Sequence, residues 1–312
     1  MKLDKTTKAA MQTGRQQATE VLAFRAKALK RRAKALNTHV QKLRAGAKSV
    51  KALEALPKKV TTAGVLIAEG DSWFDYPFHD ILEMLEDDHG YDVESVAHKG
   101  DSAENMAYGD NQLEEFTRRI EKMIRRKTIP KAILLSAGGN DIAGDGFAML
   151  INHVRSSSAG LNEQIVAGVI DQRIQEAYFS ILSAVTAVCE SLIGHALPIL
   201  LHGYDYPVPD GRGFLGGFSF LPGPWLEPGF REKGFDDVEQ NKETMKVLIN
   251  RFNAMVRRVS QAPGFEHVKF IDLRNTLTTG PKYKDLWANE MHPTGKGFSL
   301  VTDRFVQALQ EL

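Results

Sequence analysis

The sequence predicts an α/β fold, a three-layer doubly wound parallel sheet, preceded by a long basic N-terminal helix. After Pro57, short apolar runs alternate with longer helical stretches, which is the order of parallel strands joined by crossover helices. Before Pro57, residues 5–56 are rich in Ala, Lys, Arg, Gln and Leu and contain no proline, so they favour one continuous helix. We therefore expect a helical arm over residues 1–60 and an α/β body over residues 61–312.

The body alternates between the two kinds of element. The apolar runs expected to form strands are residues 65–68, 93–97, 132–137, 197–202 and 268–273. The stretches expected to be helical are residues 78–88, 111–127, 161–193, 238–260 and 296–312. In sheets of this kind, active sites lie at the carboxyl ends of the strands.

The arm differs from the body in charge. Residues 1–60 carry 16 Lys/Arg and 3 Asp/Glu, whereas the remaining 252 residues carry 24 and 36. A heptad seam of alternating four- and three-residue steps predicts coiled-coil packing on the body or in a homo-oligomer. Its members are Leu22, Ala26, Leu29, Ala33, Leu36, Val40, Leu43, Ala47 and Val50. The basic charge leaves open an anionic lipid, a nucleic acid or an acidic protein as a partner. Because the arm has few aromatic residues for base stacking, we expect no specific nucleic-acid recognition.

Several classes of protein are disfavoured. The single cysteine, Cys189, cannot form an internal disulfide, and the histidines show no metal-ligand spacing, so we expect no metal and no cofactor. The N-terminus has no apolar leader, which favours a cytoplasmic protein. We also expect no transmembrane segment, because no run of about 18 apolar residues is evident.

A candidate nucleophile follows the first expected strand. The triplet Gly70-Asp71-Ser72 places a serine between a strand and a helix. This is a position at which an α/β enzyme presents a nucleophile. The triplet alone is a weak signal.

Three further segments occur in a fixed order after it. They are Lys99-Gly100-Asp101-Ser102, Gly138-Gly139-Asn140-Asp141 and the segment 289–294, which contains His292. Together with the Ser72 triplet, these segments resemble the four sequence blocks of the SGNH/GDSL hydrolases, a family of esterases and lipases. The resemblance covers about residues 64–312 and implies the three-layer, flavodoxin-like fold of that family.

The resemblance also implies residue roles. Ser72 matches the nucleophile and His292 matches its base. The N–H groups of Ser72 and Gly100, with the side-chain amide of Asn140, match the oxyanion hole. Such preorganised donors are each worth roughly 3–4 kcal/mol in other enzymes.

The sequence departs from the family at one position. The residue three before the histidine is normally Asp, and here it is Asn289. The Asn oxygen can accept an imidazole N–H bond but lacks the charge that stabilises an imidazolium. We expect Asn289 to orient His292. Glu290 is the nearest alternative, and the spacing makes Asp272 and Asp285 weaker ones.

One stretch shows neither helical nor strand periodicity. Residues 204–234 are dense in Gly, Pro and aromatic residues, so we expect an ordered flap over the site rather than disorder. Trp225 and Tyr204 are its candidate substrate contacts.

The sequence therefore predicts a serine esterase acting on a small acyl ester, a lipid or an acylated sugar. The alternative is a catalytically degenerate fold that binds partners through the basic arm. Asn289 favours the alternative, whereas the set of Ser72, Gly100, Asn140 and His292 favours the enzyme.

Overall fold

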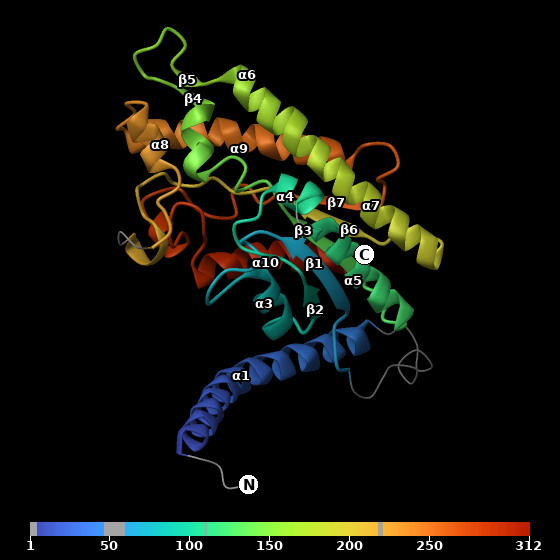
Figure 1. Cartoon of the computed structure of the whole chain (residues 1–312). Helices are drawn as coiled ribbons and strands as arrows, with labels where there is room; N and C mark the ends of the chain where they lie inside the picture. The colour runs from blue at the N-terminus through green and yellow to red at the C-terminus, as the bar shows by residue number, and fades with distance from the viewer. Residues whose placement is uncertain (1–4, 47–59, 110, 218–220) are drawn as a thin grey trace. The chain divides into compact units, whose positions relative to one another are not determined.

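The computed structural model describes residues 5–46, 60–109, 111–217 and 221–312. These divide into two compact units, and the larger one contains residues 65–84 and 93–312. At its centre lies a five-stranded sheet of order β2-β1-β3-β6-β7 (Figure 1). The strands are β1 Val65–Gly70, β2 Asp92–Ser95, β3 Ala132–Ser136, β6 Ile199–His202 and β7 Val268–Ile271.

All five strands run parallel. Strand β3 pairs in parallel with β1 and β6, and β6 pairs in parallel with β7. At the β2 edge, the N–H groups of Val96 and His98 donate to the carbonyls of Ala68 and Gly70 with one constant offset, as in a parallel ladder. Numbered within this sheet alone, the order is 2-1-3-4-5, which is the flavodoxin-like doubly wound order. The predicted fold class is confirmed.

Helices cover both faces of the sheet, with α7 and α9 on one face and α10 on the other (Figure 1). The long helices are α5 Gln112–Arg125, α7 Gln175–Ile193, α9 Val238–Ser260 and α10 Gly295–Gln310. The shorter helices are α3 Ile81–Asp87, α4 Ala103–Tyr108, α6 Glu163–Val166 and α8 Glu227–Glu232. A π-helical stretch, Ala167–Ile174, joins α6 to α7. A small hairpin pairs β4 Ile151–Asn152 with β5 Gly160–Leu161.

Periodicity explains how these helices form the core. In α10, Phe298, Val301, Phe305 and Leu309 recur on one face and are buried. The hydroxyl of Thr294 accepts the N–H of Gly297 and caps the start of the helix. This cap fixes the point at which the chain leaves the loop that carries the predicted histidine.

Among the described residues, one continuous helical stretch, residues 163–193, is long and apolar enough to cross a membrane by length and composition. The absence of a transmembrane segment stays a prediction. In the structure Ile174, Tyr178, Ile181 and Val185 are buried at helical spacing. The core helix of a soluble protein meets the same criteria of length and composition.

The smaller unit combines the described residues up to Gly64 with residues 85–92, so its boundary differs from the expected break at residue 60. Helix α1 spans Lys5–Ala45. Its Arg25 and Arg31 pair with the buried carboxylate of Asp87, and Arg32 pairs with Asp92. These ion pairs join the two segments of the unit.

The heptad seam is only partly described. Leu29 and Leu43 are exposed, and Ala47 and Val50 lie outside the described residues. The described structure therefore does not pack the whole predicted seam, and its pairing in a coiled coil stays a prediction.

Candidate active site

The sheet brings the predicted site residues to one edge. Ser72 follows β1, Gly100 follows β2 and Asn140 follows β3, while His292 lies in the loop before α10. The four residues line one pocket of about 350 Å³. The pocket's other lining residues are Tyr76, Pro77, Lys99, Phe214, Leu221, Pro222 and Trp225.

Serine and histidine are in direct contact. The Oγ atom of Ser72 lies 2.7 Å from Nε2 of His292, within hydrogen-bond range. On the far side of the ring, Nδ1 lies 3.0 Å from Oδ1 of Asn289. Because an amide oxygen only accepts, Nδ1 must carry the proton and Nε2 is left free to accept the proton of Ser72. This is the tautomer that a general base requires.

The orientation of the Asn289 amide is fixed by its neighbours. The backbone N–H groups of Met291 and His292 donate to Oδ1 at 3.0 and 2.9 Å. The amide nitrogen donates to the hydroxyl of Tyr76 at 3.0 Å. The oxygen therefore faces the imidazole, because a flipped amide would place its N–H₂ group against these two backbone donors.

Two aromatic rings enclose the imidazole. The ring of Tyr76 stacks on His292 with centroids 4.2 Å apart and planes 17° apart. Trp225 meets the same ring edge-on at 5.3 Å. Burial lowers the pKa of His292 to about 3, so the ring is neutral and able to accept a proton at neutral pH. Tyr76 was missed by sequence reasoning, although the aromatic run Trp73-Phe74-Asp75-Tyr76 directly after the serine was a visible signal.

The residues that carry the three candidate oxyanion-hole donors, Ser72, Gly100 and Asn140, all line this pocket. Within the described structure, no protein acceptor is bound to the backbone N–H of Ser72 or of Gly100. Gly100 adopts φ +93°, a left-handed conformation that favours glycine, while a Cβ there would meet no atom within 4 Å. The Asn140 amide donates one N–H to the carbonyl of Asp101 at 2.8 Å, which leaves its second N–H available.

A buried network braces the loops that carry these groups. The carboxylate of Asp71 accepts the N–H of Trp73 at 3.0 Å and the hydroxyl of Ser136 at 2.7 Å. It also accepts the hydroxyl of Tyr204, which itself accepts the N–H of Gly139 at 3.2 Å. Burial raises the pKa of Asp71, and the three donors offset that rise. The network ties the turn that carries Ser72 to the loop that carries Asn140.

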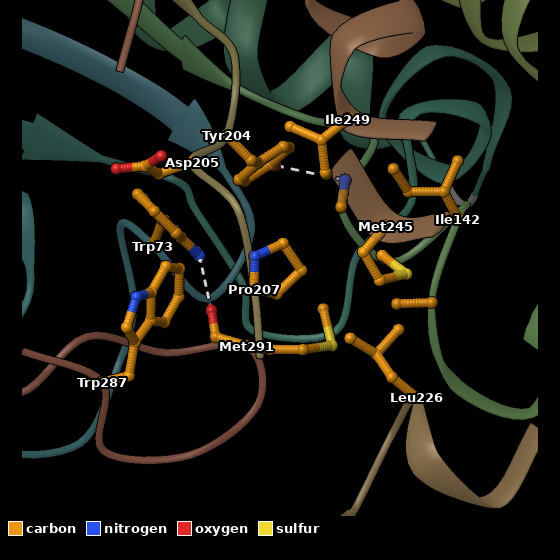
Figure 2. A pocket seen from close by; sticks show the side chains of 12 residues that line it. Trp73, Ile142, Tyr204, Asp205, Pro207, Leu226, Met245, Ile249, Trp287 and Met291 are labelled. Atoms are coloured by element: carbon orange, nitrogen blue, oxygen red, sulfur yellow. Dashed lines mark hydrogen bonds between the residues drawn. The ribbon is translucent and has the colours of Figure 1, made fainter. Parts of the chain in front are cut away.

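Tyr204 therefore lies elsewhere than expected for a substrate contact. It is buried and does not line the Ser72 pocket. Instead it lines a separate cavity of about 30 Å³, shown in Figure 2. Trp73 and Met291 border the same cavity and are joined there by the indole N–H donating to the Met291 carbonyl at 3.1 Å (Figure 2). Position in the sequence alone could not show whether the Tyr204 side chain enters the Ser72 pocket or the separate cavity.

The flap is ordered over its described parts, residues 204–217 and 221–234. Contrary to the expectation of no regular structure, it contains helix α8. Its aromatic and apolar residues Phe214, Leu221, Pro222 and Trp225 form one side of the Ser72 pocket. The structure thus places Trp225, but not Tyr204, in the wall of the Ser72 pocket.

The side chains of Glu290 and Asp272 bind groups other than His292. Glu290 accepts hydrogen bonds from flap backbone groups, and Asp272 pairs with Arg274 and Arg257. Among the candidates from the sequence, Asn289 is the residue whose side-chain oxygen contacts Nδ1 of His292. In the part of the chain that is described, no cluster of three His, Cys, Asp or Glu side chains could hold a metal ion.

The chain was compared with known proteins. No protein-family model matches it, and no curated protein matches it. Among solved structures, it resembles the lipase Lip_vut3 from a goat rumen metagenome, at 15% identity over 78% of this chain and 96% of that chain, with a TM-score of 0.47. It also resembles a protein from Slackia heliotrinireducens proposed to be an SGNH hydrolase, at 11% identity over 79% and 98% of the two chains, with a TM-score of 0.45. A third is the acetylxylan esterase Axe2 from Geobacillus stearothermophilus, in a catalytic mutant form, at 13% identity over 80% and 95%, with a TM-score of 0.39.

Proposed function

We propose that this chain is a serine hydrolase of the SGNH/GDSL type that cleaves a carboxylic ester. The observation that carries the proposal is the aligned series Ser72, His292 and Asn289, with contacts of 2.7 and 3.0 Å. A serine hydroxyl held against a neutral imidazole whose other nitrogen is oriented by an acceptor is the arrangement of an activated nucleophile.

The reaction would proceed in two halves. His292 takes the proton of Ser72 as the Oγ atom attacks the ester carbonyl, and then returns that proton to the leaving alcohol. The free N–H groups of Ser72 and Gly100, with the Asn140 amide, would stabilise the oxyanion. Water activated by His292 then hydrolyses the acyl-enzyme and regenerates Ser72.

A fluorophosphonate probe tests the proposal directly, because it labels only an activated serine. We expect the wild-type chain to be labelled and Ser72→Ala not to be. Ser191→Ala, an exposed serine on α7, is the matched control and should label like the wild type. Ser72→Ala should also abolish hydrolysis of short-chain p-nitrophenyl esters with a nearly unchanged thermal melt.

The alternative function is binding through the arm by a degenerate fold. A folded wild-type chain that neither takes the probe nor hydrolyses esters would favour it. The neutral Asn289 is the observation in its support, because it leaves the imidazolium without a charged partner.

A further inference from the structure

Glu290 is completely buried and follows Asn289, whose side-chain oxygen contacts His292. Its carboxylate makes no contact with the imidazole. Instead each oxygen accepts two backbone N–H groups from the flap. Oε1 accepts from Gly211 at 2.9 Å and Glu227 at 3.0 Å, and Oε2 accepts from Trp225 at 2.7 Å and Leu226 at 2.8 Å.

These four bonds join two separate limbs of the flap. Gly211 belongs to its first limb, whereas residues 225–227 belong to its second. The N–H of Glu290 also donates to the carbonyl of Arg212 at 3.2 Å, which adds a fifth bond to the first limb. One side chain thus fixes both limbs to the loop that carries His292.

The charge of Glu290 is balanced by these bonds. In the described part of the chain, no Lys, Arg or His side chain forms an ion pair with it. A buried carboxylate without a cation is unfavourable unless its oxygens are hydrogen-bonded, and four donors satisfy both of them. The same donors would be left unpaired if the carboxylate were removed, so the flap and the carboxylate stabilise each other.

Trp225 connects this cluster to the pocket. Its backbone N–H donates to Glu290, while its indole lines the Ser72 pocket and meets the ring of His292 edge-on. The hydrogen bond to Glu290 therefore holds the backbone of the residue whose indole lines the Ser72 pocket. Because the indole borders His292, it lies on the side from which a leaving alcohol would take its proton.

We propose that Glu290 is a positioning residue that fixes the flap and thereby determines which leaving groups the pocket accepts. Of these two neighbouring residues, Asn289 orients the imidazole of His292, and Glu290 fixes the Trp225 side of the Ser72 pocket. The specificity part rests on the proposed hydrolase function, whereas the anchoring of the flap does not.

The anchoring is tested by hydrogen exchange. In Glu290→Gln the amide keeps one acceptor oxygen and turns an N–H₂ group toward the other pair of donors. We expect exchange to accelerate at Gly211 and residues 225–227, with α9 unchanged. Glu227→Gln is the matched control. It removes a carboxylate from the same segment, but this carboxylate forms its ion pair with Arg231 at the surface. Unchanged protection of these four amides in Glu290→Gln would overturn the anchoring.

The specificity is tested with two acetate esters that differ only in the alcohol, 1-naphthyl acetate and ethyl acetate. We expect Glu290→Gln to lower the ratio of their kcat/KM values by about tenfold, the discrimination that one altered apolar contact supplies. Trp225→Ala should lower it similarly, and the double variant should lower it no further, because both act through one indole. Additive effects, or an equal loss on both esters, would contradict the specificity role.

Two of these measurements distinguish a failure of the hydrolase function from a failure of the anchoring. Fluorophosphonate labelling of wild type reports on the hydrolase function alone, and flap exchange reports on the anchoring alone. If Glu290→Gln does not fold, Glu290→Asp takes its place, because the shorter carboxylate keeps the charge but cannot reach all four N–H groups. Wild-type exchange at these amides in Glu290→Asp would then refute the proposal.

Discussion

The Oδ1 atom of Asn289 lies 3.0 Å from Nδ1 of His292. The amide fixes the ring and its tautomer, but it gives the imidazolium no opposite charge. With burial acting alone, the pKa of His292 falls to about 3. In the site, Ser72 contacts His292, and the residue that contacts the other ring nitrogen, Asn289, carries no charge.

The first prediction concerns the pH profile. Protonated His292 cannot accept the Ser72 proton, so kcat/KM should fall as pH drops through the pKa of His292. Because that pKa is lowered to about 3, the wild-type acid limb should lie well below the usual range of histidine. Asn289→Asp adds a negative charge, which favours the imidazolium, and should move the acid limb to higher pH. The measurement is a pH profile of kcat/KM for both proteins.

Two companion variants make this prediction specific. Asn289→Ala should lose activity, but less than His292→Ala. Should Asn289→Asp leave the profile in place while Glu290→Gln moves it, the assignment of Asn289 as the orienting group would be wrong.

The second prediction concerns the oxyanion hole. Asn140→Ala should lower kcat by roughly 10²–10³, with a smaller change in KM, because the interaction strengthens only in the transition state. The amide also donates to the carbonyl of Asp101, so a thermal melt should accompany the kinetics. An effect confined to KM would assign Asn140 to ground-state binding.

The third prediction concerns a buried carboxyl on β1. Burial raises the pKa of Glu69 to about 8, and its Oε2 atom has no partner among the described residues. The unfolded chain releases this proton near the ordinary pKa of glutamate, so the free energy of unfolding should fall as pH rises from about 4.5 to 8.

Glu69→Gln removes this titration and keeps an acceptor for Gly70 and Gln112. Relative to wild type, the variant should gain more than about 1.4 kcal/mol between pH 5 and pH 9, the value of a single pKa unit. Chemical denaturation at the two pH values measures the gain. Parallel stability curves would show that Glu69 does not titrate in this window.

The fourth prediction concerns the arm. Deleting residues 1–56 should leave a chain that still reacts at Ser72, because every proposed site residue lies beyond that segment. It should also lower the thermal melting temperature, since the buried Asp87 carboxylate loses Arg25 and Arg31. If the arm associates chains, sedimentation should show a smaller oligomer for the truncated form. A truncated protein that no longer folds would mean that the arm is part of the core.

Local sequence patterns were enough to predict the sheet and the order of the candidate site residues along it. Strand and helix periodicity are local properties, so the alternation after Pro57 was enough to predict five parallel strands. Since the carboxyl ends of parallel strands share one edge, Ser72, Gly100 and Asn140 were bound to lie near one another. The contact between Asn289 and His292 was expected from the resemblance to the SGNH/GDSL blocks, in which the residue three before the histidine is its partner.

The directions of side chains whose contacts come from distant segments could be seen only in the folded chain. Asn289 and Glu290 are adjacent in sequence, yet one faces the imidazole and the other faces the flap. Tyr204 and Trp225 belong to the same aromatic-rich stretch, yet Tyr204 donates a hydrogen bond to Asp71 and Trp225 lines the Ser72 pocket. A local pattern carries no information about these directions, because each is set by hydrogen-bond partners many residues away that become neighbours only when the sheet assembles.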